Sequence, residues 1–191
     1  RGGSFPGIRP PGIRPGGELV TPPTVCFLCT GNAARSVMAR VMFADRAPDW
    51  RAVGAGTLVF EGLPMSQRTR NALADHGLAD PDHRSRQFGI DHEAADLVVA
   101  MEPSHVAWIR RHHPAAAGRT ASLPRLARDL VPGDAADLAD RVGALALAEV
   151  EVAEWEEVVD PAGGDQVDFD TCAATLDGLV DTLVARLGPC R

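Results

Sequence analysis

The stretch Cys29-Thr30-Gly31-Asn32-Ala33-Ala34-Arg35-Ser36 places a cysteine and an arginine at either end of five small or polar residues. An apolar run, Val25 to Leu28, precedes it and an amphipathic run follows it, which predicts a strand, a loop and a helix in succession. A glycine-containing loop that enters a helix turns its backbone N–H groups toward one point, where the helix dipole adds partial positive charge. We therefore expect residues 30 to 36 to bind a tetrahedral oxyanion.

The two ends of this stretch carry the groups that suit phosphate chemistry. A positive field favours the thiolate form of a cysteine, which is the nucleophilic form, so Cys29 is a candidate nucleophile. Arg35 offers a planar fork of N–H donors that can bind two phosphate oxygens, and unlike lysine it does not lose its charge. The alternative interpretation is a structural loop that contains an inert thiol.

Composition limits the classes of function. The 191 residues, 45% of them hydrophobic, suit one domain with a full core. A net charge of −7 without any basic run argues against binding to nucleic acid or to an anionic membrane. No stretch reaches the roughly 18 to 20 apolar residues of a membrane span, and the first residues of the sequence lack the apolar segment typical of a secretory signal. Because a thiolate catalyst needs a reducing compartment, we expect a cytoplasmic protein.

The strand and helix signals alternate along most of the chain. Residues 1–23 repeat Pro-Gly-Ile-Arg-Pro in tandem, which predicts a disordered tail before a single domain at 24–188. Strands are expected at 24–28, 51–53, 97–100 and 120–123, and helices at 36–47, 66–76, 102–111 and from Phe169 to Leu187. This order predicts an α/β fold, a three-layer αβα sandwich around a four-stranded parallel sheet. An extra helix is expected around 134–158, without an assigned role.

The sequence resembles one family along residues 24–188. Cys29-x5-Arg35-Ser36 directly after the first strand, with Gly31-Asn32 inside it and Asp160-Pro161 far downstream, resembles the low-molecular-weight protein tyrosine phosphatases. The resemblance implies that fold, and hydrolysis of a phosphomonoester through a phospho-cysteine, without a cofactor or a metal. It also implies that Cys29 is the nucleophile, Arg35 the clamp on the transition state, and Asp160 the general acid.

The resemblance assigns supporting roles as well. It implies that Asn32 shapes the loop and that Ser36 donates a hydrogen bond to the Cys29 thiolate; Ser36 could also cap the following helix, alone or together with that role. Asp80-Pro81 is a second Asp-Pro pair. It lies before the third strand, where the family has no acid, so Asp160 is preferred.

Two departures from the family pattern affect regulation and specificity. Ala34 stands where many relatives carry a second cysteine that protects the nucleophile by a reversible disulfide. The chain contains no tyrosine, and Ala162 follows Asp160-Pro161 where relatives place an aromatic wall of the cleft. Phe60, in the loop after the second strand, is the candidate for the opposite wall. We expect a cleft between Phe60 and Ala162 that accepts a phosphotyrosine protein or a small aryl phosphate.

The remaining cysteines and the histidines indicate no further chemistry. Cys26 and Cys29 match a Cys-x-x-Cys pattern, but three residues of strand span about 10 Å, beyond the roughly 7 Å limit for a disulfide. Cys172 is expected in the core of the C-terminal helix, and Cys190 is expected to be incidental. The histidines at 83, 105, 112 and 113 lack the paired spacing of metal ligands and are interpreted as surface residues.

Two other functions remain open from the sequence. Thiol-linked arsenate reductases share the fold and the loop, because arsenate is isosteric with phosphate. Reductases that resolve internally need further cysteines near the site, and residues 101–108 contain none. A form that uses an external thiol stays possible. The third hypothesis is a phosphate-binding pseudophosphatase. The intact Cys29, Arg35 and Asp160 argue against it.

Overall fold

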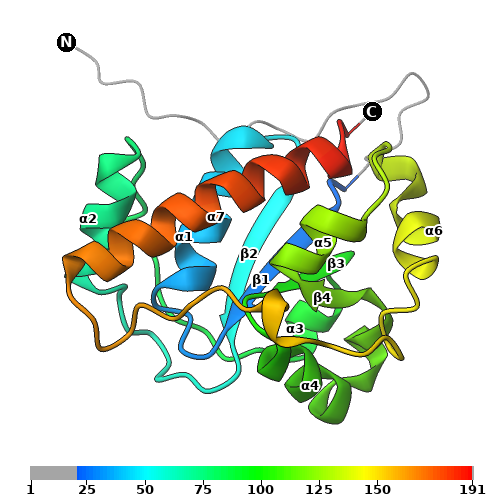
Figure 1. The fold of residues 1–191 in the computed structure, drawn as a ribbon, viewed down its shortest axis with the longest axis horizontal. Coiled ribbons are helices and arrows are strands. Elements are labelled where there is room, and N and C mark those ends of the chain that lie inside the picture. The colour runs from blue at the N-terminus through cyan, green and yellow to red at the C-terminus, as the bar shows by residue number, and fades with distance from the viewer. Residues whose placement is uncertain (1–20, 191) are drawn as a thin grey trace.

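The computed structural model describes residues 21–190, which form a parallel sheet covered by helices (Figure 1). The predicted tail at 1–23 lies almost entirely outside the described residues. The strands are β1 (Thr24–Cys29), β2 (Arg51–Gly56), β3 (Leu97–Ala100) and β4 (Thr120–Ser122). They pair in the order β2-β1-β3-β4, all parallel. The predicted four-stranded parallel sheet is confirmed.

Helices connect the strands and cover both faces of the sheet. They are α1 (Arg35–Arg46), α2 (Gln67–Asp75), α3 (Ile90–Glu93), α4 (Pro103–His112), α5 (Leu123–Asp129), α6 (Leu138–Gly143) and α7 (Gln166–Leu187), with 3₁₀ turns η1 (Pro114–Arg119), η2 (Ala135–Asp137) and η3 (Glu154–Glu156). Figure 1 shows α7 lying across α1 and α5 on one face of the sheet. The helix at 66–76 begins after Ser66, whose side chain caps it as expected.

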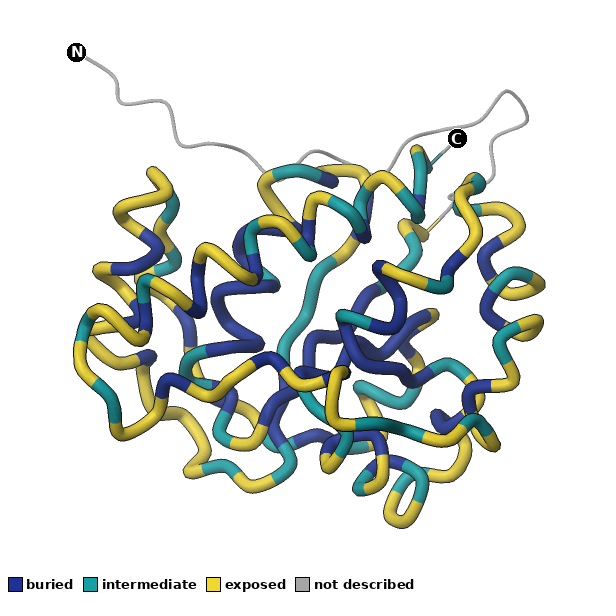
Figure 2. Tube along the Cα trace, viewed as in Figure 1, coloured by how far each residue is buried: buried dark blue, intermediate teal, exposed yellow. Residues whose placement is uncertain are grey.

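The burial pattern of β1 explains the three layers. Successive side chains of a strand point to opposite faces, and every β1 residue from Val25 to Cys29 is buried. Val25 and Phe27 pack with α1 and α7, whereas Cys26 and Leu28 pack with Val98 and the helices on the other face. Buried segments accordingly concentrate in the centre of the molecule (Figure 2). The resemblance and the strand pattern both predicted this arrangement.

The carboxyl ends of three strands meet around the loop that follows β1. The Thr57 N–H donates to the Cys29 carbonyl at 3.0 Å, and the Met101 N–H donates to the Leu28 carbonyl at 3.0 Å. Residues that follow β2 and β3 therefore flank the end of β1. This edge of a parallel α/β sheet is where ligands bind.

The segment between α5 and Asp160 differs from its prediction. A helix was expected around 134–158, but the only α-helix in that range is the six-residue α6, and a single 3₁₀ turn lies on each side of it. The helix ends at Gly143, and Ala146 has a φ of 48°, in the left-handed region that breaks a right-handed helix. Beyond α6 the segment runs back along the lower edge of the sheet to the start of α7 (Figure 1).

Within residues 21–190, no helix combines the length and the apolar character needed to cross a membrane.

Candidate active site

The loop between β1 and α1 is shaped by Asn32. Its φ is 48°, and its buried side chain donates from Nδ2 to Ser36 Oγ at 3.1 Å and accepts from the Arg86 N–H at 3.0 Å. Its carbonyl accepts hydrogen bonds from His83 Nε2 and from Ser85 Oγ, both at 2.8 Å. Asparagine tolerates left-handed geometry, and these four bonds offset its strain. Residues 83–86 therefore support the loop.

Cys29 lies at the start of this loop, with 3% of its surface exposed. Its Sγ is 3.0 Å from Ser36 Oγ, so the serine hydroxyl can donate to a thiolate. Ser36 does not cap α1, because the helix begins at Arg35 and the residue in the N-cap position is Ala34. Of the two interpretations of Ser36, the contact with Cys29 is present and the cap is not.

The other three cysteines are less suited to act as nucleophiles. Burial raises the pKa of Cys26 to about 12, and its side chain packs on the opposite face of the sheet from Cys29. Burial likewise raises the pKa of Cys172 to about 12, in the core beneath the loop. Burial also raises the pKa of Cys190. The expected core position of Cys172 is confirmed, and the placement of Cys26 rules out a disulfide with Cys29 in this fold.

Arg35 closes the loop from the first turn of α1, with 1% of its surface exposed. Its Nη1 donates to Glu102 Oε2 at 2.5 Å and to the Val158 carbonyl at 3.1 Å, and its Nη2 donates to Asp160 Oδ2 at 2.5 Å. Burial alone would raise the pKa of Glu102, but hydrogen bonds from Ser104 and Arg35 outweigh burial and hold that pKa below its ordinary value. Glu102 is therefore an ionised anchor for the guanidinium, and the sequence analysis missed it.

The two aspartates of the Asp-Pro pairs, Asp160 and Asp80, lie in different surroundings. Asp160 contacts Arg35, and its Oδ1 accepts from the Ala162 N–H at 3.0 Å. Asp80 instead pairs with Arg40 and lines a cavity of about 460 Å³ that includes none of Cys29, Arg35 or Asp160. The structure thus brings Asp160 and not Asp80 to Arg35, and the role of Asp160 as the acid stays a prediction.

Two histidines that were interpreted as surface residues are buried at the loop. His83 is 7% exposed and His105 is 2% exposed. His105, from α4, places Nε2 at 3.0 Å from Thr30 Oγ1, and burial lowers its pKa to about 4 although Glu102 opposes that shift. In each ring Nε2 pairs with a polar group of the loop, whereas His105 Nδ1 is buried without a hydrogen-bond partner among the described residues. Among residues 21–190, no three His, Cys, Asp or Glu side chains are grouped to hold a metal ion.

The two predicted cleft residues remain predictions. Phe60 is 83% exposed in the loop after β2, and Ala162 is exposed beside Asp160. Leu58, Leu63 and Val159 are also large apolar residues with more than half of their surface exposed. These side chains come from the loops that follow β2 and precede Asp160.

Comparisons with known proteins show the family to which the chain belongs. The sequence model of the family described as low molecular weight phosphotyrosine protein phosphatase matches residues 24–142. Low molecular weight protein-tyrosine phosphatase A of Mycobacterium tuberculosis is 34% identical over 179 residues, which cover 86% of this chain and 96% of that protein.

Two solved structures have the same fold over most of their length. The low molecular weight protein tyrosine phosphatase from T. tengcongensis has a TM-score of 0.69 at 28% identity, covering 86% of this chain and 99% of that one. An arginine phosphatase from Geobacillus stearothermophilus has a TM-score of 0.69 at 25% identity, covering 85% and 90%. The chain therefore belongs to the low molecular weight phosphotyrosine protein phosphatase family of cysteine-dependent hydrolases.

Proposed function

We propose that this chain hydrolyses aryl phosphate monoesters, including phosphotyrosine in proteins, in two steps through a phosphate bound to Cys29. The observation that carries the proposal is the distribution of donors on Arg35. A guanidinium has five N–H donors. Glu102 and the Val158 carbonyl take both hydrogens of Nη1, and Asp160 takes one of Nη2. In the part of the chain that the structure describes, Nε and the second Nη2 hydrogen remain for two phosphate oxygens.

In the first step, Cys29 Sγ attacks phosphorus while the bond to the leaving oxygen breaks. The developing charge on the phosphoryl oxygens is stabilised by Arg35 and by the backbone N–H groups of residues 30–35. Asp160, protonated beside the bound dianion, gives its proton to the leaving oxygen. Ser36 stabilises the thiolate before attack, through the 3.0 Å contact with Sγ.

In the second step, water attacks the phospho-cysteine. Asp160, now a carboxylate, takes a proton from that water, and the sulfur leaves as a thiolate that Ser36 again stabilises. Phosphate is released, and the enzyme returns to its initial state. This cycle needs a reduced thiol, which is why we place the enzyme in the cytoplasm.

The decisive experiment compares two leaving groups. We expect Asp160→Asn to lower kcat/KM for phenyl phosphate by roughly 10² to 10⁴, the usual worth of general acid catalysis. The loss should be smaller for 4-nitrophenyl phosphate, whose leaving group hardly needs a proton. Asp80→Asn is the matched control and should leave both values near those of the wild type. Equal losses for both substrates at Asp160 would contradict its role as the acid.

Two further assays on the same purified protein test the alternatives. Arsenate reduction with an external thiol, at a rate above that of aryl phosphate hydrolysis, would favour the reductase. A phosphoarginine peptide is the third substrate, because one structural relative is an arginine phosphatase. We expect phosphotyrosine peptides to be the better substrates. No turnover of any substrate would favour the pseudophosphatase.

A further inference from the structure

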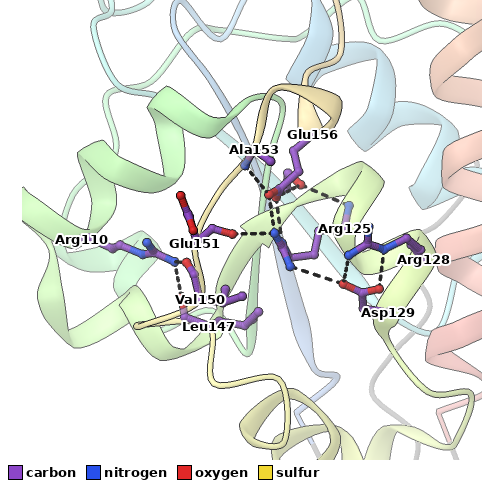
Figure 3. Close-up of polar contacts among 10 residues, drawn as sticks. Arg110, Arg125, Arg128, Asp129, Leu147, Val150, Glu151, Ala153 and Glu156 are labelled. Atoms are coloured by element: carbon purple, nitrogen blue, oxygen red, sulfur yellow. Dashed lines mark hydrogen bonds and ion pairs between the residues drawn. The ribbon is translucent and has the colours of Figure 1, made fainter.

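A fully buried carboxylate lies four residues before Asp160. Glu156 has 0% of its surface exposed, and both of its oxygens are fully used (Figure 3). Oε1 accepts from Arg125 Nη2 at 2.5 Å and from the Ala153 N–H at 2.9 Å. Oε2 accepts from Arg125 Nε at 2.9 Å and from Ser122 Oγ at 2.7 Å. Burial alone would raise the pKa of Glu156, but these bonds outweigh it and keep the group ionised.

Other arginine contacts fasten the same segment. Arg125 Nη2 also donates to the Glu151 carbonyl at 2.8 Å, and Arg110 donates from α4 to the carbonyls of Leu147 and Val150 at 2.6 and 2.7 Å (Figure 3). Residues 144–153 form no regular helix, so these side chains satisfy carbonyls that a helix would have satisfied itself. Residues 147–156 are thereby tied to α4, α5 and the end of β4.

The segment continues directly from Glu156 into the active site. Glu157 is extended, and Val158 is buried with its N–H donating to the Met101 carbonyl at 2.8 Å. The Val158 carbonyl accepts from Arg35, and two residues later Asp160 contacts the same guanidinium. Because four extended residues span at most about 14 Å, fixing Glu156 also restricts where Asp160 can lie.

The buried ion pair of Glu156 and Arg125 is not explained by its contribution to stability. Replacing a buried ion pair by apolar residues of similar volume is often neutral or stabilising, because desolvation offsets the attraction between the charges. Its benefit here is geometric: a bidentate contact defines both the position and the orientation of the chain. We propose that Glu156, held by Arg125 and Ser122, is a positioning residue that places Asp160 for proton transfer. This inference rests on the proposed role of Asp160 as the general acid.

The test asks whether weakening the ion pair between Glu156 and Arg125 has the same kind of kinetic effect as removing Asp160, the proposed acid. Glu156→Gln keeps the shape of the side chain but weakens the bidentate pair. We expect kcat/KM for phenyl phosphate to fall about tenfold, a part of the full contribution of the acid, and that for 4-nitrophenyl phosphate to fall less than threefold. Arg125→Lys, which keeps the charge, should show a smaller loss of the same kind. Equal losses for the two substrates, or no loss, would overturn the inference.

A second variant covers the case in which Glu156→Gln does not fold. The double substitution Arg125→Met with Glu156→Leu removes both charges and keeps the site packed. We expect it to fold and to show the same leaving-group-dependent loss; a wild-type ratio between the two substrates would overturn the inference. If the double variant also fails to fold, the result with Arg125→Lys decides, since that change retains the ion pair.

Arg141→Met is the matched control. The Arg141 side chain donates five hydrogen bonds against the four of Arg125, but to Asp137 and to carbonyls of residues 131, 134, 186 and 187, away from the Asp160 segment. We expect it to lower the unfolding midpoint without changing the substrate ratio. If Asp160→Asn itself shows no leaving-group dependence, the proposed function fails. If Asp160→Asn shows it and the Glu156 and Arg125 variants do not, only the positioning inference fails.

Discussion

Two regions form the candidate site around the Arg35 guanidinium: the loop after β1 and the segment before Asp160. They differ in how far apart in the sequence their contacting residues lie. In the loop, the contacts of Cys29 and Asn32 with Ser36 join residues seven and four positions apart. In the segment before Asp160, the contact between Arg125 and Glu156 joins residues 31 positions apart, and Asp160 lies 125 positions from Arg35. The family's sequence model matches residues 24–142, so it ends before this segment. The site thus combines a half that one short stretch of sequence reveals, although residues 83–86 support it, and a half whose position depends wholly on distant partners.

The strongest test of the local half is Cys29→Ser. An alcohol replaces the thiolate, so turnover of any aryl phosphate should fall by about 10⁴ to 10⁶-fold, as for other nucleophile replacements. The backbone N–H groups and Arg35 are unchanged, so inorganic phosphate should still bind, measured by calorimetry. Cys172→Ser, at a buried thiol in α7, is the control and should keep full activity per folded molecule. Turnover above this range by a Cys29→Ser preparation free of wild-type enzyme would contradict the nucleophile assignment.

A second test addresses how the loop keeps its shape. Asn32→Ala removes two side-chain hydrogen bonds and leaves a residue with a Cβ at φ 48°, so the free energy of unfolding should fall by roughly 2–4 kcal/mol. Asn32→Gly loses the same bonds but accepts the backbone conformation. Urea unfolding of both variants separates the two effects, and the alanine variant should be less stable by about 1 kcal/mol. Equal stability of the two variants would show that the backbone conformation there carries no strain.

The same comparison explains what the sequence could predict. The four strands and the catalytic loop depend on apolar periodicity and on neighbouring residues, and the predicted strand at 97–100 coincides with β3. Cys29 and Arg35 could be found because their chemistry requires a fixed spacing on one loop. Asp160 was predicted as the acid through resemblance alone, since nothing local distinguishes it from Asp80.

The missed residues share one property. Glu102, His105 and Glu156 are defined by partners that lie far away in sequence: Arg35, Thr30 and Arg125. A weak signal existed for the first two, because they follow β3 at the carboxyl edge of the sheet. The extra helix expected around 134–158 is shorter than predicted. Ala, Leu and Glu in that range favour a helix locally, whereas the arginines of α4 and α5 hold part of the range beyond α6 in another conformation.

A third test follows from His105, which links the loop to α4. Its folded pKa of about 4 lies below the ordinary 6.5, so the unfolded chain binds more protons between these values. Stability from this group is therefore complete above pH 6.5 and is lost as pH falls toward 4, by at most about 1.4 kcal/mol per pH unit. His105→Gln should flatten the pH dependence of unfolding in that window, whereas the exposed His112→Gln should not. If the free energy of unfolding depends on pH in the same way for the wild type and His105→Gln, the result would contradict the lowered pKa of His105.

The smallest expected effect concerns Phe60 and Ala162, the two predicted cleft residues, which we call the rim. They belong to neither half of the site. Phe60 is 83% exposed, and Ala162 is exposed beside Asp160. Stacking on one aromatic ring is worth about 0.5 to 1.5 kcal/mol, so Phe60→Ala should raise KM for phenyl phosphate by roughly two- to tenfold. Ala162→Tyr should lower KM for the same reason.

Neither rim change should alter hydrolysis of a small alkyl phosphate, which has no ring to stack, and this substrate is the internal control. Leu63→Ala, at another exposed apolar residue after β2, is the matched variant. A rise in KM for Phe60→Ala alone would place Phe60 against the substrate ring. If Phe60→Ala leaves KM for the aryl substrate unchanged, the wall of the cleft must come from elsewhere, and the segment that Arg110 and Arg125 hold is the next candidate, because it leads directly to Asp160.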